Sequence, residues 1–210
     1  MGKFYKGILG GFSGKVGTVI GSRWKGLEYM RSKSAPRRGG FSLKQLEQQA
    51  RFGLAVRFLQ PLQPALAIGY RAAVRHSTFM NKAVSDLLQY AIEGDYPDYQ
   101  VAPALVRIAQ GPLQAPSGCN VAVQGGRVVV TWTAPTGQLR GSEHDGVLLV
   151  ALTPGGVPCF DLLTATRGQG TASVELPTAD PGAQVYVYLA FASQSCDDVS
   201  NSVVAGVITL

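Results

Sequence analysis

The sequence has few of the residues that most enzymes use for chemistry. Its 210 residues include three cysteines and two histidines. The cysteines, Cys119, Cys159 and Cys196, are odd in number and lack a CxxC spacing, so we expect reduced or buried thiols. Neither His76 nor His144 has another ligand at a metal-binding spacing. We therefore predict no enzymatic activity, no catalytic residue, no metal, no cofactor and no small-molecule substrate.

Long apolar runs are also missing. No stretch reaches the roughly 20 residues that cross a bilayer. The first residues, MGKFYKGILGGFSGKVGTVIG, are partly apolar, but glycines and Lys15 interrupt them and no convincing cleavage site follows. We expect a protein without a membrane span or a classical signal peptide, located in the cytoplasm or in a virion or similar assembly.

Acidic residues are scarce in the first part of the chain. Residues 1–85 contain 15 Lys and Arg against Glu28 and Glu47, a balance of +13. Residues 86–210 contain 4 Arg against 11 Asp and Glu, a balance of −7, and the two parts together give the net charge of +6. This separation favours an acidic partner for the basic part, and it equally permits attraction between copies of the chain.

The basic part begins with a predicted β-hairpin. Lys25-Gly26 suits a two-residue turn, because Gly26 can adopt a positive φ. The turn sets a register with three cross-strand pairs: Trp24 with Leu27, Arg23 with Glu28, and Ile20 with Arg31. In this register Trp24, Leu27 and Tyr29 share one face of the hairpin.

Three helices are predicted to follow the hairpin. A capping-box pattern at Ser42 opens the first, and Pro61 and Pro64 end it. The second runs over about 65–75 and the third over about 82–93, where Gly94 suits a C-cap. We interpret residues 1–110 as a basic module of one hairpin and three helices.

The rest of the chain, residues 111–210, has the alternation of a β-sandwich. The stretch NVAVQGGRVVVTWTAP predicts a hairpin around Gly125-Gly126, with Val128, Val130 and Trp132 on one face. The sequence therefore predicts an α+β fold, in which the basic module precedes an all-β immunoglobulin-like sandwich.

Particular stretches resemble known proteins. VVVTWTAP, with Trp132 as the expected core indole, and LPTADPGAQVYVYLAFAS resemble a fibronectin type III or immunoglobulin-like sandwich. MGKFYKGILGGFSGKVGTVIGSRWKGLEYMRSKSAP, followed by QQARF and GDYPDYQV, resembles an uncharacterised family common in Bacteroidetes genomes. The hairpin, the basic loop and QQARF also resemble modules of phage and prophage proteins. These resemblances imply a fold but no activity and no site residues.

Cations and aromatic residues alternate in and after the hairpin. They form our predicted partner-binding set: Arg23, Trp24, Lys25, Tyr29, Arg31, Lys33, Arg37 and Arg38. Three interpretations remain open: a solvated cationic face with its aromatics packed on the helices, a protein assembly surface, or a nucleic-acid interface. We expect a non-enzymatic structural protein that self-assembles into a homo-oligomer, related to phage or prophage proteins. The alternative is a nucleic-acid-binding protein that uses the same residues.

Overall fold

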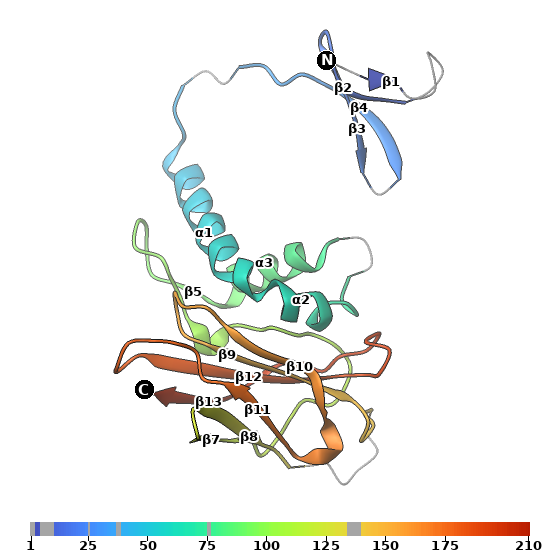
Figure 1. Ribbon diagram of the computed structural model, residues 1–210. Coiled ribbons are helices and arrows are strands. Elements are labelled where there is room, and N and C mark those ends of the chain that lie inside the picture. Colours follow the sequence, from blue (N-terminus) through green and yellow to red (C-terminus); the bar gives the residue numbers. More distant parts are fainter. Residues whose placement is uncertain (1–2, 5–10, 25, 37–38, 75–76, 134–139) are drawn as a thin grey trace. The chain divides into compact units, whose positions relative to one another are not determined.

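The computed structural model divides the chain into two compact units. It describes residues 1–210 except 1–2, 5–10, 25, 37–38, 75–76 and 134–139 (Figure 1). The first unit, Met1–Ser42, is called the hairpin unit here, and the second, Leu43–Leu210, is called the sandwich unit. The prediction that residues 1–110 and 111–210 are separate domains concerns independent folding and stays a prediction.

The hairpin unit is a four-stranded antiparallel sheet. Its strands follow the chain in the order β1-β2-β3-β4, with bounds β1 Lys3–Phe4, β2 Phe12–Val16, β3 Val19–Trp24 and β4 Leu27–Ser32. The predicted register is confirmed, since Trp24 pairs with Leu27, Arg23 with Glu28, and Ile20 with Arg31. Gly26 has φ +85°, as the turn requires, and Lys25 lies outside the described residues.

The hairpin unit has little core of its own. Among the described residues, every buried large hydrophobic side chain lies between positions 55 and 199, and all six residues of β4 are exposed. One place of close packing in the unit is Gly21, where a Cβ would collide with the backbone carbonyl and the ring of Phe12. The strand ladder therefore holds this unit together with few buried side chains to support it.

The helices begin the sandwich unit, and they correct the expected three-helix module. Helix α1 (Leu43–Leu59), the 3₁₀ turn η2 (Gln60–Leu62) and α2 (Gln63–Gly69) form one continuous helical run, 43–69. The prediction that Pro61 and Pro64 end the first helix is wrong. Pro61 and Pro64 instead lie at the N1 or N2 position of η2 and α2, where a missing N–H breaks no helical hydrogen bond.

A second helical segment, α3 (Phe79–Tyr90), follows a turn. It begins where the Oγ1 of Thr78 accepts a hydrogen bond of 3.2 Å from the N–H of Asn81. The expected third helix, 82–93, therefore starts and ends three residues too late. The expected second helix extended to residue 75, whereas α2 ends at Gly69.

Two antiparallel sheets form the rest of the sandwich unit, which confirms an α+β fold with sandwich-like sheets. The first has the order β11-β8-β7 and the second β10-β9-β12-β13. Their bounds are β7 Asn120–Gln124, β8 Arg127–Thr131, β9 Gly146–Leu152, β10 Cys159–Thr166, β11 Thr171–Glu175, β12 Gln184–Ala192 and β13 Val203–Thr209. Short segments complete the unit: β5 Ile92–Glu93, β6 Gln100–Val101, η3 Pro103–Leu105 and η4 Arg167–Gln169.

The predicted hairpin around Gly125-Gly126 is confirmed, because Gln124 pairs with Arg127. The predicted inward face is confirmed as well. Val128 and Val130 are fully buried, and Trp132 is 6% exposed. Alternation along this segment therefore identified which side chains enter the core.

Strands β9 and β12 are buried on both faces, which places the sandwich unit in three layers (Figure 1). On one face, Val147 and Leu149 of β9 pack in the core between the two sheets. On the other face, Val150 of β9 and Tyr188 of β12 pack in one cluster with the helices. The helices thus form the outer layer of the four-stranded sheet.

Candidate functional site

One face of the hairpin unit carries large exposed side chains. Cross-strand pairing puts Ile20, Trp24, Leu27 and Tyr29 on the same side, and these four residues are called the aromatic face. Trp24 is 53% exposed, Leu27 71% and Tyr29 48%. The predicted sharing of one face is confirmed. Trp24, Leu27 and Tyr29 lie at the surface of the hairpin unit, whereas Ile20 is half-buried.

The predicted partner-binding residues do not all lie on that face. The register places Arg31 with the aromatic face, whereas Arg23 lies on the opposite side beside Glu28. There, Gly11, Phe12, Ser13, Arg23 and Glu28 line a hollow of about 370 Å³. Glu28 lies against Gly11, because a Cβ at Gly11 would collide with the Glu28 carboxylate. The hairpin unit therefore presents two chemically different faces.

The other predicted cations follow the turn or the last strand. Lys33 comes directly after β4, and its backbone N–H donates to the carbonyl of Thr18 at 2.7 Å. Lys25, Arg37 and Arg38 lie outside the described residues.

The outer edge of β4 is a feature that the sequence reasoning missed. β4 ends the strand order, so the described residues place no strand on its outer side. Hydrogen-bonded and non-hydrogen-bonded pairs alternate along an antiparallel ladder. Because Lys33 bonds to Thr18, residues 27, 29, 31 and 33 of this segment direct their backbone N–H and C=O groups towards β3. It follows that the backbone N–H and C=O of Glu28, Met30 and Ser32 point away from β3. Local sequence pattern gives no signal for this edge, because strand order is a property of the whole sheet.

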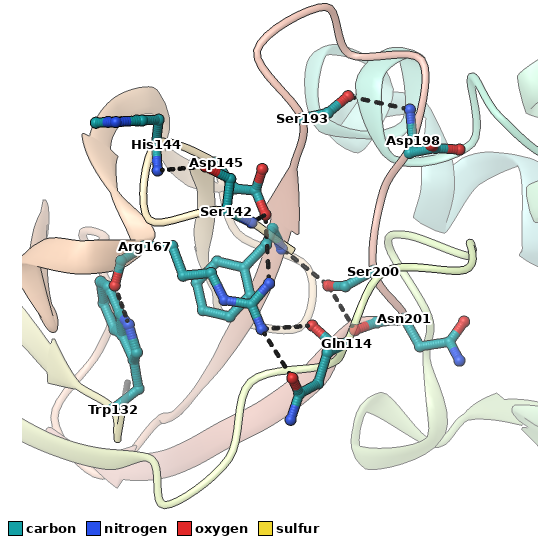
Figure 2. Close-up of polar contacts among 11 residues, drawn as sticks. Gln114, Trp132, Ser142, His144, Asp145, Arg167, Ser193, Asp198, Ser200 and Asn201 are labelled. Carbon is teal, nitrogen blue, oxygen red and sulfur yellow. Dashed lines mark hydrogen bonds and ion pairs between the residues drawn. The ribbon is translucent and has the colours of Figure 1, made fainter. Parts of the chain in front are cut away.

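The sandwich unit contains a buried polar cluster around Arg167 (Figure 2). The Arg167 guanidinium lies 3.3 Å from the Asp145 carboxylate and 4.6 Å from the centre of the Phe191 ring. Its second amino group donates to the Gln114 carbonyl at 3.4 Å. The backbone N–H of Ser142 donates to Asp145 at 2.8 Å. Because both charged side chains are buried and bonded, this arrangement is structural.

Trp132 belongs to the same cluster. Its indole N–H donates to the Arg167 carbonyl at 2.9 Å, and its ring meets that of Phe191 edge-on at 5.7 Å. The predicted role of Trp132 as the core indole is confirmed.

A second buried polar group joins the helices. The Tyr70 hydroxyl donates to Asp86 at 3.0 Å and lies 3.2 Å from the Arg107 carbonyl oxygen. Lys82 pairs with Asp86 at 2.8 Å. Burial, followed by the charge of Asp86, raises the pKa of Tyr70 well above its usual range. The phenol therefore stays neutral and serves as a donor that fixes α3 to the end of α2.

A hollow of about 730 Å³ lies along β10 and β11 of the sandwich unit. Its lining includes Cys159, Asp161 and Glu175. Burial raises the pKa of the Cys159 thiol, and Glu175 adds to the rise. Since the thiolate is the reactive form, this environment makes Cys159 a poor nucleophile.

The remaining sequence candidates do not assemble into a catalytic centre in the described part of the chain. His144 is exposed, and His76 lies outside the described residues. Across the described ranges, no group of three His, Cys, Asp or Glu residues is placed to hold a metal ion. Nor is any of the described helices both long enough and apolar enough to cross a membrane.

Comparison with protein families gives one match. Residues 11–206 match the model of a family of unknown function, DUF6266, and the match spans both compact units. The expectation of an uncharacterised family is thus confirmed, while the Bacteroidetes and phage resemblances stay predictions. The comparison with curated proteins found no match.

Proposed function

We propose, from the premise that the chain belongs to the DUF6266 family of unknown function, that it is a non-enzymatic structural protein that self-assembles through its hairpin unit. The observation that supports this function is the exposure of β4. All six of its residues are exposed, and Leu27 and Met30 are each 71% exposed. Association would bury these side chains, at a gain of about 1.5–3 kcal/mol for each large apolar side chain that is fully covered.

The distribution of charge supports a second copy of the chain as the partner. Most basic residues lie in the first 85 positions and most acidic residues in the remainder, so the basic part of one copy attracts the acidic part of another. We place the assembly in the cytoplasm or in a virion, and this context rests on the phage and prophage resemblance alone.

We further propose that the β-sandwich is of the fibronectin type III kind. Its three-stranded and four-stranded antiparallel sheets, and a long β12 that carries Tyr186 and Tyr188, support this assignment. In such a protein the sandwich would be a rigid body, and the hairpin unit would supply the contact.

Light scattering on the full chain tests this function. We expect a mass above that of one chain for the wild type, and a shift towards one chain for L27S/Y29S. Val157→Ser is the matched control, because Val157 is an 80% exposed apolar residue of the sandwich unit. A double variant that keeps the wild-type mass, or a control that loses it equally, would contradict assembly through the hairpin unit.

The alternative function is nucleic-acid binding, and the aromatic face gives a specific reason to test it. Exposed Lys15 and Arg31 share that face with Trp24 and Tyr29, so cations that bind phosphate stand beside rings that stack on bases. An absorbance ratio at 260 and 280 nm typical of protein, and an oligomer that survives nuclease, would exclude it. If nucleic acid is bound, R31S/K33S should reduce the log–log salt slope by about 0.7–0.9 per lost phosphate contact.

A further inference from the structure

We propose that β4 pairs edge to edge and antiparallel with β4 of a second copy, so that two hairpin sheets become one continuous sheet. This inference rests on the proposed self-assembly through the hairpin unit and names the contact. Its starting point is the outer edge of β4, where the backbone groups of Glu28, Met30 and Ser32 point away from β3. A strand edge of this length is a template for another strand.

Symmetry limits the possible registers. A two-fold axis perpendicular to the sheet puts corresponding side chains of the two copies on the same face, and directly opposed residues must also share a face. Both conditions hold only if one residue of β4 lies directly opposite the same residue of the second copy. That residue is called the centre of the register. A centre at Glu28 or at Arg31 would set like charges directly opposite each other, which is destabilising.

The register centred on Met30 makes the fullest use of the edge. It places Met30 opposite Met30 of the second copy, and Glu28 opposite Ser32 of the second copy. The backbone groups that point away from β3 in all three residues then form hydrogen bonds with the second copy. A centre at Tyr29 would instead place Ser32 opposite Gly26, which lies in the turn.

Side-chain chemistry favours the same register. Tyr29 then lies opposite Arg31 of the second copy in a non-hydrogen-bonded pair, where the Cα atoms approach to about 4.5 Å. A guanidinium beside an exposed phenol ring is a favourable cation–π arrangement, and the symmetry provides it twice. On the opposite face, Glu28 meets the neutral Ser32. The charges of β4 are thus compatible with a second β4.

The contact also has a distinctive salt dependence. The hairpin unit is basic, so two of them repel each other at long range, while the bonds across the edge are local. Screening within a Debye length of about 8 Å at physiological salt reduces the repulsion. Edge pairing should therefore hold or tighten as salt rises, whereas docking of the basic unit on an acidic surface should weaken.

Cysteine cross-linking of the full chain tests the register. Opposed residues of a hydrogen-bonded pair have Cα atoms about 5.5 Å apart, within the range of a disulfide. We expect Met30→Cys to form a covalent dimer on mild oxidation, and E28C/S32C to do the same. Glu28→Cys, Ser32→Cys and Tyr29→Cys alone should form far less. Wild-type protein measures the background from Cys119, Cys159 and Cys196, which are free thiols.

A proline pair tests the hydrogen bonds. Met30→Pro removes an N–H that points outward, so the ladder between β3 and β4 keeps its bonds. Met30→Ala keeps the N–H and removes only the side chain. We expect Met30→Pro to lose the dimer in light scattering and Met30→Ala to retain it.

The possible outcomes separate the two proposals. A wild-type chain that is monomeric would overturn both. A wild-type oligomer in which Met30→Cys forms no covalent dimer would overturn edge pairing and leave assembly to another surface. Cross-linking strongest at Tyr29→Cys or equal at all positions would overturn the Met30-centred register.

Discussion

At the scale of single residues, a few buried side chains connect different parts of the sandwich unit. Arg167 follows β10, yet it contacts Asp145, Gln114 and the ring of Phe191 (Figure 2). Trp132 adds a hydrogen bond to the Arg167 carbonyl. Each polar group in this cluster has a hydrogen-bonding partner within the cluster. Removing one group therefore leaves its partner buried without that hydrogen bond.

Trp132 provides the first prediction. Trp132→Ala should lower the free energy of unfolding by about 3–5 kcal/mol, the range for truncating a buried large aromatic side chain. Trp132→Phe retains a ring but leaves the Arg167 carbonyl without its donor, at a cost of about 1–3 kcal/mol. Denaturant unfolding measures both. A loss below about 1 kcal/mol for the alanine variant would contradict the burial of the indole.

Tyr70 provides the second prediction, on alkaline stability. Burial and Asp86 raise the pKa of Tyr70 above the usual value near 10, so the folded state holds the phenol proton to higher pH than the unfolded state. The stabilising contribution is complete below about pH 10 and is lost as the pH rises above it. The wild type should therefore lose stability above about pH 10, where unfolded tyrosine ionises.

Tyr70→Phe tests the assignment. This variant should be less stable at neutral pH, because Asp86 loses a donor, but its stability should fall less steeply above about pH 10. Tyr188, whose pKa burial also raises, should contribute in the same sense, and Y70F/Y188F should flatten the profile further. Urea unfolding at a series of pH values measures the slopes. Equal slopes for wild type and Tyr70→Phe would refute the role of Tyr70.

At the scale of elements, close approach of helix and loop decides what the sequence tolerates. The end of α2 lies against the segment around Ile108, and the Gln110 N–H donates to the Gly69 carbonyl at 3.0 Å. A Cβ on Gly69 would collide with the Ile108 carbonyl. Gly53 of α1 has open space at the position that a Cβ would occupy.

The two glycines give a matched pair of substitutions. Gly69→Ala should destabilise the protein by about 1–3 kcal/mol, because the backbone must shift to admit the methyl group. Gly53→Ala should stabilise it by about 0.5–1 kcal/mol, because alanine loses less entropy in a helix. Thermal or denaturant unfolding measures both changes. Destabilisation by Gly53→Ala, or none by Gly69→Ala, would contradict the packing of α1 and α2.

Sequence reasoning predicted the elements better than their packing. The two-residue turn at Lys25-Gly26 fixed the register of the hairpin, and alternation around Trp132 identified the inward face, because both depend on local geometry. The prediction of a helix end at Pro61 was wrong. A proline is tolerated at the start of a new helical turn, and the local pattern did not indicate that η2 begins there. The runs VLLVAL and VYVYLAFA carry the signal of burial on both faces, which the sequence reasoning did not use. The exposed edge of β4 could not be read from local pattern, because strand order is a property of the whole sheet.

At the scale of the whole molecule, the chain combines two units of different character. The sandwich unit has one core between its two sheets and another between the four-stranded sheet and the helices, whereas the hairpin unit exposes its last strand and its aromatic face. A sheet with so little burial is marginal in isolation. We infer that its sequence is adapted to a partner and that the partner is a second copy.

The most direct test of this claim compares the solution mass of the full chain with that of residues 43–210 over a range of concentrations. Sedimentation equilibrium after nuclease treatment provides the measurement, and circular dichroism confirms that the shorter chain is folded. Our account predicts that the full chain associates and that residues 43–210 stay folded and monomeric at every concentration. A shorter chain with the same association as the full chain would contradict assembly through the hairpin unit.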